Sequence, residues 1–463
     1  MRVLIQLRTT PQLQAAMAAG DTIAPTATAA EALRPAGLVV DQGYDPVELP
    51  APRVPEEDAR LLALGGPLEF SFQPEDVTHL IRGTIPEDEG QEAVLAEAMA
   101  HPGVLGVFSD PTIEPFLTCI GDPPVGTDKD VARLVERRKL EAAGMTGRGV
   151  HLAIVDTGIN VAHLRAAGQP AKLNAAKSFT PRGVQSKPGR HLVDHGTMCA
   201  FDAGIAAPEA TFLDHAVLLS QRVGDSPLSG LLSDAVRSFA KLRMVLDDMP
   251  RARRALVASN SWGMFDPRSD FPVGHPGNYS NNPRHPFNVI VASLETAGAD
   301  ILFAAGNCGV ECEDGRCNFR RRPICGANSH GRVLSVAGID TKRKRVGYSS
   351  QGPGRLFAQK PDLAAYTHFT GSKVFAPDPD GGTSAACPVL AGIVAAVRSK
   401  YSAARLPPAS LRALLFKTAD DLGGVGFDFD HGWGAVNTTA LLAALGGVPT
   451  AARRPRAVVG AAR

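Results

Sequence analysis

The apolar segments in the second half of the chain are of two kinds. Short runs with little polar alternation predict strands that are buried on both faces of a sheet. These runs lie at residues 149–156, 211–218, 255–259, 300–305 and 332–337. Apolar positions at helical spacing predict helices at residues 231–246 and 287–297, between the strands. Strands that alternate with helices predict an α/β fold with a doubly wound parallel sheet.

The first 117 residues carry a different pattern, in which Pro and Gly separate short alternating segments. Strands are predicted at residues 3–7, 68–72, 77–85 and 103–108, with a helix at residues 91–100. This order predicts a smaller N-terminal α+β domain at residues 1–117. We expect a breaker-rich linker at 118–130, a larger domain at 131–447 and a basic, disordered tail at 448–463.

Composition and charge narrow the possible partners of the chain. Its 463 residues include 48 Lys and Arg against 47 Asp and Glu, a net charge of +1. This balance gives no electrostatic reason to expect binding to nucleic acid or to an anionic membrane. No segment is long and apolar enough to span a membrane, and the apolar start is too short for a signal peptide. A cytoplasmic location is therefore expected, with export by another route left open.

Small residues precede a serine at the start of a further apolar segment. Ser384 follows Gly381, Gly382 and Thr383, and the apolar run 389–394 comes after it. The N-terminus of a helix offers N–H groups and a positive dipole end, which suit a serine nucleophile in acyl transfer. Such a serine is more often a simple helix cap, so the catalytic interpretation requires partners elsewhere.

Two other residues could supply those partners. Asp156 ends a predicted strand, and His195 lies in the segment Asp-His-Gly-Thr-Met. With Ser384 they provide an acid, a base and a nucleophile in the chain order Asp, His, Ser. Each residue alone has a structural explanation, since a strand-end Asp often caps a helix and a single His is often structural.

The segments around these residues resemble the three catalytic motifs of the subtilisin-like serine proteases. They read Asp-Thr-Gly at 156–158, His-Gly-Thr at 195–197 and Gly-Thr-Ser at 382–384. Ser-Asn-Ser-Trp-Gly at 259–263 resembles the family's substrate-strand motif, and Phe-Ala-Ala-Gly-Asn at 303–307 resembles the segment with its oxyanion asparagine. The resemblance covers roughly residues 130 to 445 and implies a subtilisin-like catalytic domain.

The resemblance also implies a role for each residue. His195 accepts the proton of Ser384, Asp156 holds the imidazole of His195, and Asn307 donates to the oxyanion together with the Ser384 backbone N–H. An extended peptide is expected between two flanking segments. These segments are formed by Ser261, Trp262, Gly263, Ala304, Ala305 and Gly306. The ring of Trp262 is expected either in the core or in the groove, where it would narrow a side-chain pocket.

Seven cysteines are present, and four of them lie close together after Asn307. These four are Cys308, Cys312, Cys317 and Cys325. Local disulfides, free thiols and a metal site are all possible, although the spacing matches no common zinc pattern. Cys199 and Cys387 are expected near the catalytic centre, so sensitivity to thiol reagents is a hypothesis. Structural calcium is frequent in the family, but no ligand set stands out, and catalysis requires no cofactor.

The end of the N-terminal domain, residues 101–111, resembles the end of an inhibitory propeptide of this family. We therefore expect the domain to act as an intramolecular inhibitor, with cleavage between about Phe116 and Asp130; a fixed accessory domain is the alternative. The predicted function is a serine endopeptidase acting on peptides or proteins through an acyl-enzyme on Ser384. A dedicated processing protease and a catalytically silent binding or chaperone protein are the alternatives.

Overall fold

The computed structural model describes residues 1–19, 23–34, 36–86, 90–116, 123–219, 228–319 and 321–448. The predicted tail at 448–463 therefore lies, apart from its first residue, outside the described residues. The helices are α1 (Pro11–Ala18), α2 (Ile23–Leu33), α3 (Arg60–Ala63), α4 (Gln91–Ala100), α5 (Asp128–Leu134), α6 (Arg137–Ala142), α7 (Val161–Ala166), α8 (His195–Ala206), α9 (Leu232–Asp247), α10 (Pro286–Thr296), α11 (Gly382–Arg398), α12 (Pro408–Thr418) and α13 (Thr438–Leu445). The strands are β1 (Arg2–Arg8), β2 (Val39–Val40), β3 (Val47–Leu49), β4 (Ala51–Pro52), β5 (Phe70–Ser71), β6 (Thr78–Thr84), β7 (Val104–Ser109), β8 (Thr112–Pro115), β9 (His151–Val155), β10 (Lys172–Leu173), β11 (Thr211–His215), β12 (Gly230–Leu231), β13 (Leu256–Asn260), β14 (Trp262–Gly263), β15 (Ala299–Ala304), β16 (Leu334–Ile339) and β17 (Leu363–Tyr366).

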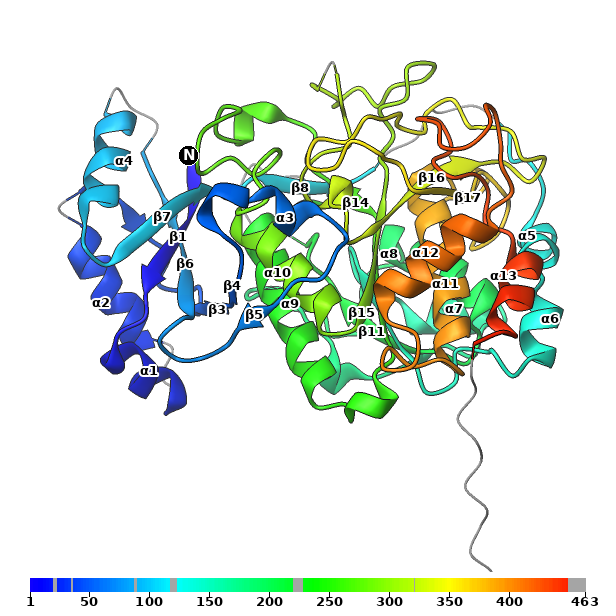
Figure 1. The fold of residues 1–463 in the computed structure, drawn as a ribbon, viewed down its shortest axis with the longest axis horizontal. Helices are drawn as coiled ribbons and strands as arrows, with labels where there is room; N and C mark the ends of the chain where they lie inside the picture. The colour runs from blue at the N-terminus through cyan, green and yellow to red at the C-terminus, as the bar shows by residue number, and fades with distance from the viewer. Residues whose placement is uncertain are drawn as a thin grey trace, which may run out of the picture.

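The larger domain is built on a seven-stranded sheet in the order β10-β11-β9-β13-β15-β16-β17, with all neighbours parallel. Successive residues of β9 point to opposite faces, as the period of a strand requires. Leu152 and Ile154 join the apolar cluster that contains α8 and α11, whereas Ala153 and Val155 join the cluster that contains α9 and α10. Helices thus cover both faces of the sheet (Figure 1), and the predicted doubly wound α/β architecture is confirmed.

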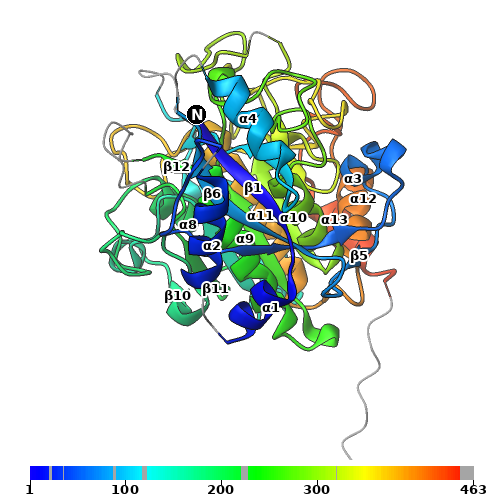
Figure 2. The same ribbon diagram turned by 90° about the vertical axis from the view of Figure 1, so that its left-hand side faces the viewer.

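The N-terminal domain has an antiparallel sheet in the order β2-β6-β1-β7, with β3 also paired to β6. Val3 and Ile5 of β1 pack in a cluster with residues of α2 and α4. Leu4, on the opposite face, belongs to the cluster of α9 and α10. The sheet therefore lies between its own helices and the larger domain; Figure 2 shows α2 and α4 on its outer side.

Most of the predicted elements are present, and the differences have local causes. The strand predicted at 68–72 is reduced to β5, which pairs only with the two residues of β4. The sequence did not predict α1 and α2, whose Ala-rich segments carry little helical periodicity. The predicted linker ends earlier than residue 130, because a capping box between Thr127 and Asp130 starts α5 at Asp128. The backbone N–H of Val125 also donates to the His368 carbonyl at 2.7 Å, so residues from 123 onward belong to the larger domain.

The two domains share a polar contact at the first turn of α9. The carboxylate of Asp110 accepts hydrogen bonds from the backbone N–H and the hydroxyl of Ser233, at 2.7 and 2.8 Å. An acceptor at this position satisfies N–H groups that have no partner within the helix. Arg82 reaches the same turn, with a 3.5 Å ion pair to Asp234. The N-terminal domain therefore caps a helix of the larger domain.

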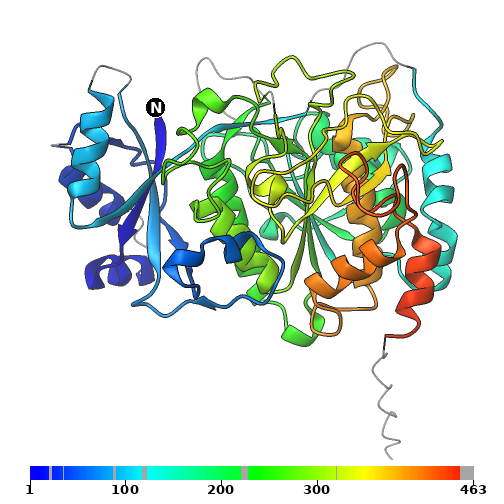
Figure 3. The same ribbon diagram turned by 45° about the horizontal axis from the view of Figure 1, so that its top comes forward.

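A long excursion between β3 and β6, residues 51–72, extends this interface. We call it the arm; it leaves the N-terminal sheet and runs along α10 (Figures 1 and 3). Leu62 is fully buried, and the carbonyl of Ala63 accepts from the Gly331 N–H at 2.8 Å. Arg332 donates to the carbonyl of Gly66 at 2.6 Å. The arm is thus anchored by backbone carbonyl groups.

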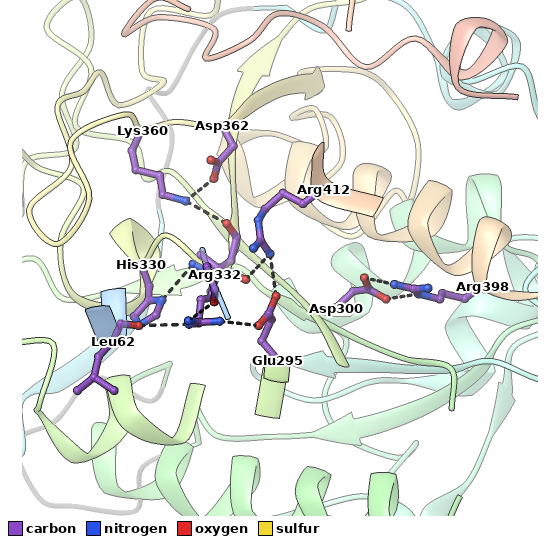
Figure 4. A network of polar contacts seen from close by, with 11 residues as sticks. Leu62, Glu295, Asp300, His330, Arg332, Lys360, Asp362, Arg398 and Arg412 are labelled. Atoms are coloured by element: carbon purple, nitrogen blue, oxygen red, sulfur yellow. Dashed lines mark hydrogen bonds and ion pairs between the residues drawn. The ribbon is translucent and has the colours of Figure 1, made fainter. Parts of the chain in front are cut away.

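Arg332 belongs to a buried ion cluster beneath the arm (Figure 4). Its guanidinium is 3.4 Å from the carboxylate of Glu295 on α10, which also pairs with Arg412 of α12 at 3.1 Å. Arg412 donates in turn to the Arg332 carbonyl at 2.8 Å. A buried guanidinium requires such partners to offset its lost hydration. The arm carbonyls therefore complete the solvation of Arg332 and tie the arm to α10 and α12.

Among the described residues, no helix is long and apolar enough to cross a membrane.

Candidate active site

Asp156 lies directly after β9, at the carboxyl edge of the parallel sheet, where functional groups of such folds gather. Its side chain is buried, and Oδ1 accepts from the Thr157 backbone N–H at 2.7 Å. The backbone N–H of Asp156 donates to the His215 carbonyl of neighbouring β11 at 2.9 Å. The sheet therefore fixes both the position and the orientation of this carboxylate.

His195 is the first residue of α8, and Asp194 caps that helix by accepting from the His195 N–H. The ring places Nδ1 at 2.8 Å from Oδ1 of Asp156. Gly196 allows this approach, because a Cβ there would lie 2.5 Å from the Gly158 carbonyl oxygen. Nε2 of His195 is buried and has no hydrogen-bond partner among the described residues. An imidazole held at Nδ1 by a carboxylate can accept a proton at Nε2.

Ser384 lies in the first turn of α11, on the helix that packs against α8. Its Oγ is within 3.5 Å of the Ser261 carbonyl oxygen, and its own carbonyl accepts from the Ser261 hydroxyl at 3.0 Å. Cys199 links the three residues: its Sγ is 3.7 Å from Asp156, 3.8 Å from His195 and 3.5 Å from the Ser384 carbonyl. The first turn of α11, which carries Ser384, thus lies beside the pair formed by Asp156 and His195.

The thiols of Cys199 and Cys387 lie at this centre, but both are buried. Burial, with the nearby Asp156 charge, raises the pKa of Cys199 well above its usual range, and burial raises the pKa of Cys387 to about 12. Because the thiolate is the reactive form, this environment argues against sensitivity to thiol reagents.

Asp156, His195 and Cys199 also form a cluster that could geometrically hold a metal ion. Because the Cys199 thiol is protonated and the Asp156 carboxylate is already hydrogen-bonded to His195, we interpret these three residues as a hydrogen-bonded cluster and not as a metal site.

Asn307 is fully buried beside the first turn of α11. Its Oδ1 accepts from the Thr383 backbone N–H at 2.9 Å and from the Thr383 hydroxyl at 3.0 Å. These two contacts identify the amide oxygen and so direct Nδ2 to the opposite branch of the side chain. Asn307 and the start of α11 therefore present the kind of N–H donors that an oxyanion requires.

The groove beside this centre is occupied by β8 of the N-terminal domain. β8 pairs antiparallel with β12 on one side, through Ile113 and Gly230, and with β14 on the other, through Glu114 and Gly263. Such pairing is how an extended peptide is added to a sheet edge. The N-terminal domain thus places its own chain along Trp262 and Gly263, one of the two flanking segments predicted from the sequence, whereas the other neighbour of β8 is β12 and not the predicted segment at residues 304–306.

The residue after β8, Phe116, fills a slot between two glycines. A Cβ on Gly263 would lie 2.6 Å from the Phe116 ring, and one on Gly306 would lie 3.1 Å from it. The ring also makes an edge contact with Phe265, with centroids 5.0 Å apart. Gly263 and Gly306 therefore create the space for an aromatic side chain, next to the segments that carry Ser261 and Asn307.

The walls of the slot are joined by Asn328, which the sequence analysis missed. Its Nδ2 donates to the Trp262 carbonyl at 2.8 Å and to the Ala304 carbonyl at 2.9 Å. Ala305 is held from behind by a 2.9 Å bond from its N–H to the Val336 carbonyl. Asn328 follows a breaker-rich loop without strand or helix periodicity, so only the two carbonyl contacts reveal its role.

The ring of Trp262 lies in the core. It is fully buried and packs against Phe303, at 5.3 Å, and Phe287, at 5.8 Å between centroids. The backbone of Trp262 pairs with Pro115 of β8, and the ring belongs to the same apolar cluster as Ile113 of that strand. Of the two interpretations left open by the sequence, the structure therefore supports the core ring, and the aromatic slot is bordered by glycine instead.

The cysteine-rich loop contains a disulfide between Cys308 and Cys317. Cys312 is also disulfide-bonded, whereas Cys325 is a buried free thiol whose pKa burial raises to about 12. The loop therefore contains two of the three alternatives, a local disulfide between Cys308 and Cys317 and a free thiol at Cys325. The disulfide closes a short loop directly after Asn307.

Comparison with known proteins agrees with this geometry. Residues 147–434 match the model of the Subtilase family, the S8 peptidases. Subtilisin DY of Bacillus licheniformis is 24% identical over 315 residues, which cover 66% of this chain and 96% of that protein. A thermostable alkaline protease of Halalkalibacterium halodurans is 25% identical over 265 residues, covering 56% of this chain and 59% of the relative.

Proposed function

Because the chain belongs to the subtilase family, we propose that it is a serine endopeptidase that cuts peptide bonds through an acyl-enzyme on Ser384. The observation that carries this proposal is the strand β8, which lies as an extended peptide in the groove beside Ser384. The 2.8 Å contact between His195 and Asp156 supports it, as does the position of Asn307.

The reaction would begin when the Ser384 hydroxyl turns from the Ser261 carbonyl toward Nε2 of His195. Nε2 takes the hydroxyl proton while Oγ bonds to the peptide carbonyl carbon, and Asp156 stabilises the imidazolium. Asn307 Nδ2 and the Ser384 N–H would donate to the oxyanion. His195 then gives its proton to the leaving amine, and the peptide bond breaks. Water attacks the acyl-enzyme by the same steps, and no cofactor takes part.

We further infer that the N-terminal domain is an intramolecular inhibitor that is cut after Phe116. Its strand pairs with both walls of the groove, and Phe116 fills the slot beside Gly263 and Gly306. The carbonyl of Phe116 would then be the one that Ser384 attacks. The expected cleavage range begins at this residue, and residues 117–122 of that range lie outside the described residues.

The experiment compares the wild-type protein with Ser384→Ala and with Ser269→Ala, a matched control at a serine away from the site. Intact-mass analysis is expected to find a cut after Phe116 in the wild-type and Ser269→Ala proteins. A fluorophosphonate probe is expected to label only these two proteins. A Ser384→Ala protein that is still cut, without added protease, would refute self-processing. Absent labelling of folded wild-type protein would instead favour a silent binding protein.

The proposal of a general endopeptidase also has an alternative within the same chemistry. A dedicated processing protease would use the same residues but would accept few sequences. A cleavage profile measured on a proteome-derived peptide library distinguishes the two, because a general enzyme cuts many sequences and a dedicated enzyme cuts few.

A further inference from the structure

The loop closed by the Cys308–Cys317 disulfide contacts the strand in the groove through Arg316. Nη2 of Arg316 donates to the carbonyl oxygen of Pro115 at 2.7 Å. Nη1 of the same guanidinium is 3.3 Å from Oε1 of Glu114. The side chain of Arg316 thus contacts both the main chain of β8 and an acidic side chain of that strand.

Arg316 is also held by residues of its own domain, in addition to its contacts with β8. Asp314 accepts from Nε at 3.1 Å and from Nη2 at 2.8 Å, and the guanidinium carbon lies 4.2 Å from the centre of the Phe265 ring. Cys317, the next residue, is fixed by the disulfide. A guanidinium held by a carboxylate, an aromatic face and a closed loop loses little conformational entropy on binding.

The two contacts with β8 have different consequences for recognition. The hydrogen bond to the Pro115 carbonyl is available to any peptide, because every residue carries this group. The contact with Glu114 depends on the side chain two positions before Phe116. Both partners are partly shielded from water, with side-chain exposures of 27% for Arg316 and 23% for Glu114. Partial burial weakens the screening of this pair by solvent and salt.

We propose that Arg316 is a specificity-determining residue that selects substrates with Glu or Asp two residues before the residue in the aromatic slot. This inference rests on the proposed endopeptidase function. Its substrate class is an extended peptide with an acidic residue, then any residue that fits between β12 and β14, then an aromatic residue at the cut. The end of β8 and the residue that follows it carry this sequence, as Glu114, Pro115 and Phe116.

The test is a competition between peptides with chromogenic C-termini, made from the sequence of residues 113–116. They read Ile-Glu-Pro-Phe, Ile-Gln-Pro-Phe and Ile-Lys-Pro-Phe; pairs of them compete for one preparation of self-processed full chain, and liquid chromatography with mass spectrometry follows the loss of each peptide. The ratio of their rates gives the ratio of kcat/KM whatever fraction of the groove β8 still occupies. For the wild-type protein we expect Glu over Gln by about 3- to 10-fold, as for a partly exposed charged pair.

Three variants make the result specific. Arg316→Gln is expected to bring the Glu-to-Gln ratio close to one, and Arg316→Lys to keep part of it. Arg316→Glu is expected to reverse the preference toward the Lys peptide. Arg268→Gln is the matched control: it removes the same charge from an exposed arginine that, among the described residues, pairs with nearby Asp266. Its ratio is expected to equal that of the wild-type protein.

The possible failures are distinguishable. Cleavage of all three peptides at equal rates by the wild-type protein would overturn the role of Arg316 and leave the endopeptidase intact. A wild-type ratio that persists in Arg316→Gln would also overturn it. Failure to cleave any peptide, with no label from the fluorophosphonate, would overturn the endopeptidase proposal and this inference with it.

Discussion

Gly263→Ala offers the sharpest test of how the slot is built. The backbone of Gly263 is not in the left-handed region, in contrast to Gly306 with φ of 101°, so alanine is compatible with its conformation. The added Cβ would lie 2.6 Å from the Phe116 ring, closer than such contacts allow. An aromatic side chain would have to leave the slot. Burying such a side chain is worth roughly 1.5–3 kcal/mol, so we expect a loss of about 10- to 150-fold in kcat/KM for Phe.

The assay uses two competing peptides, Ile-Glu-Pro-Phe and Ile-Glu-Pro-Ala, with the same C-terminal leaving group, and mass spectrometry follows the loss of each peptide. The ratio of kcat/KM for Phe over Ala should fall by this factor in Gly263→Ala, while the Ala peptide is cleaved at nearly the wild-type rate. Gly424→Ala is the matched control, because its Cβ would meet no atom within 4 Å. An unchanged ratio in Gly263→Ala would refute the assignment of the slot to the residue before the cut.

Four further predictions follow from the same geometry. Asn307→Ala should lower kcat by about 10²- to 10³-fold with little change in KM, measured by steady-state kinetics; this magnitude comes from the oxyanion asparagine of a family member and not from this structure. Burial raises the pKa of Asp110 from 3.8 to about 6, against opposing effects of Arg82 and Ser233, so docking of the N-terminal domain should be strongest below about pH 4 and should weaken as pH rises through 6. Gel filtration of the self-processed protein at several pH values should therefore show more co-eluting N-terminal fragment at low pH, and this dependence should be reduced in Asp110→Asn. Iodoacetamide at pH 8 should leave Cys199 and Cys387 of the folded protein unmodified, as checked by mass spectrometry, and rapid labelling would contradict their burial. Trp262→Leu should lower the free energy of unfolding by about 2–3 kcal/mol in denaturant titrations, with no change in the Phe-to-Ala peptide ratio, because the ring lies in the core.

The sequence predicted those parts of the site that depend on local motifs. Asp156, His195 and Ser384 each end or begin an element, and their surrounding small residues are needed for the close approach of α8 and α11 to the sheet edge. Gly196 is an example, because any side chain there would collide with the Gly158 carbonyl. A position where only glycine fits is marked by its residue type, and a residue type can be seen in a single sequence.

Contacts that use the main chain of distant segments could not be predicted in this way. Asn328 joins the carbonyls of Trp262 and Ala304, and neither carbonyl is marked by a residue type. The ring of Trp262 had two possible environments because an aromatic residue suits both a core and a groove. In the sequence, Arg316 is one of several charged residues in a polar loop. Its role depends on the disulfide that closes this loop and on the position of β8 beside it.

The contacts of the arm also use the main chain and could not be predicted from the sequence. They bear on how the enzyme would be activated. Arg332 donates to the carbonyl of Gly66, and the Gly331 N–H donates to the carbonyl of Ala63; any residues at these positions would supply such groups.

Every contact that the N-terminal domain makes through the arm, through Asp110 and through β8 comes from residues before the proposed cut after Phe116. Cleavage would therefore break one covalent bond and remove none of these contacts. The freed domain would still occupy the groove, so activity should require a second event, either dissociation or destruction of the domain. The cap that Asp110 places on α9 is expected to weaken as pH rises, because burial raises the pKa of Asp110, so a higher pH should favour release of the freed domain.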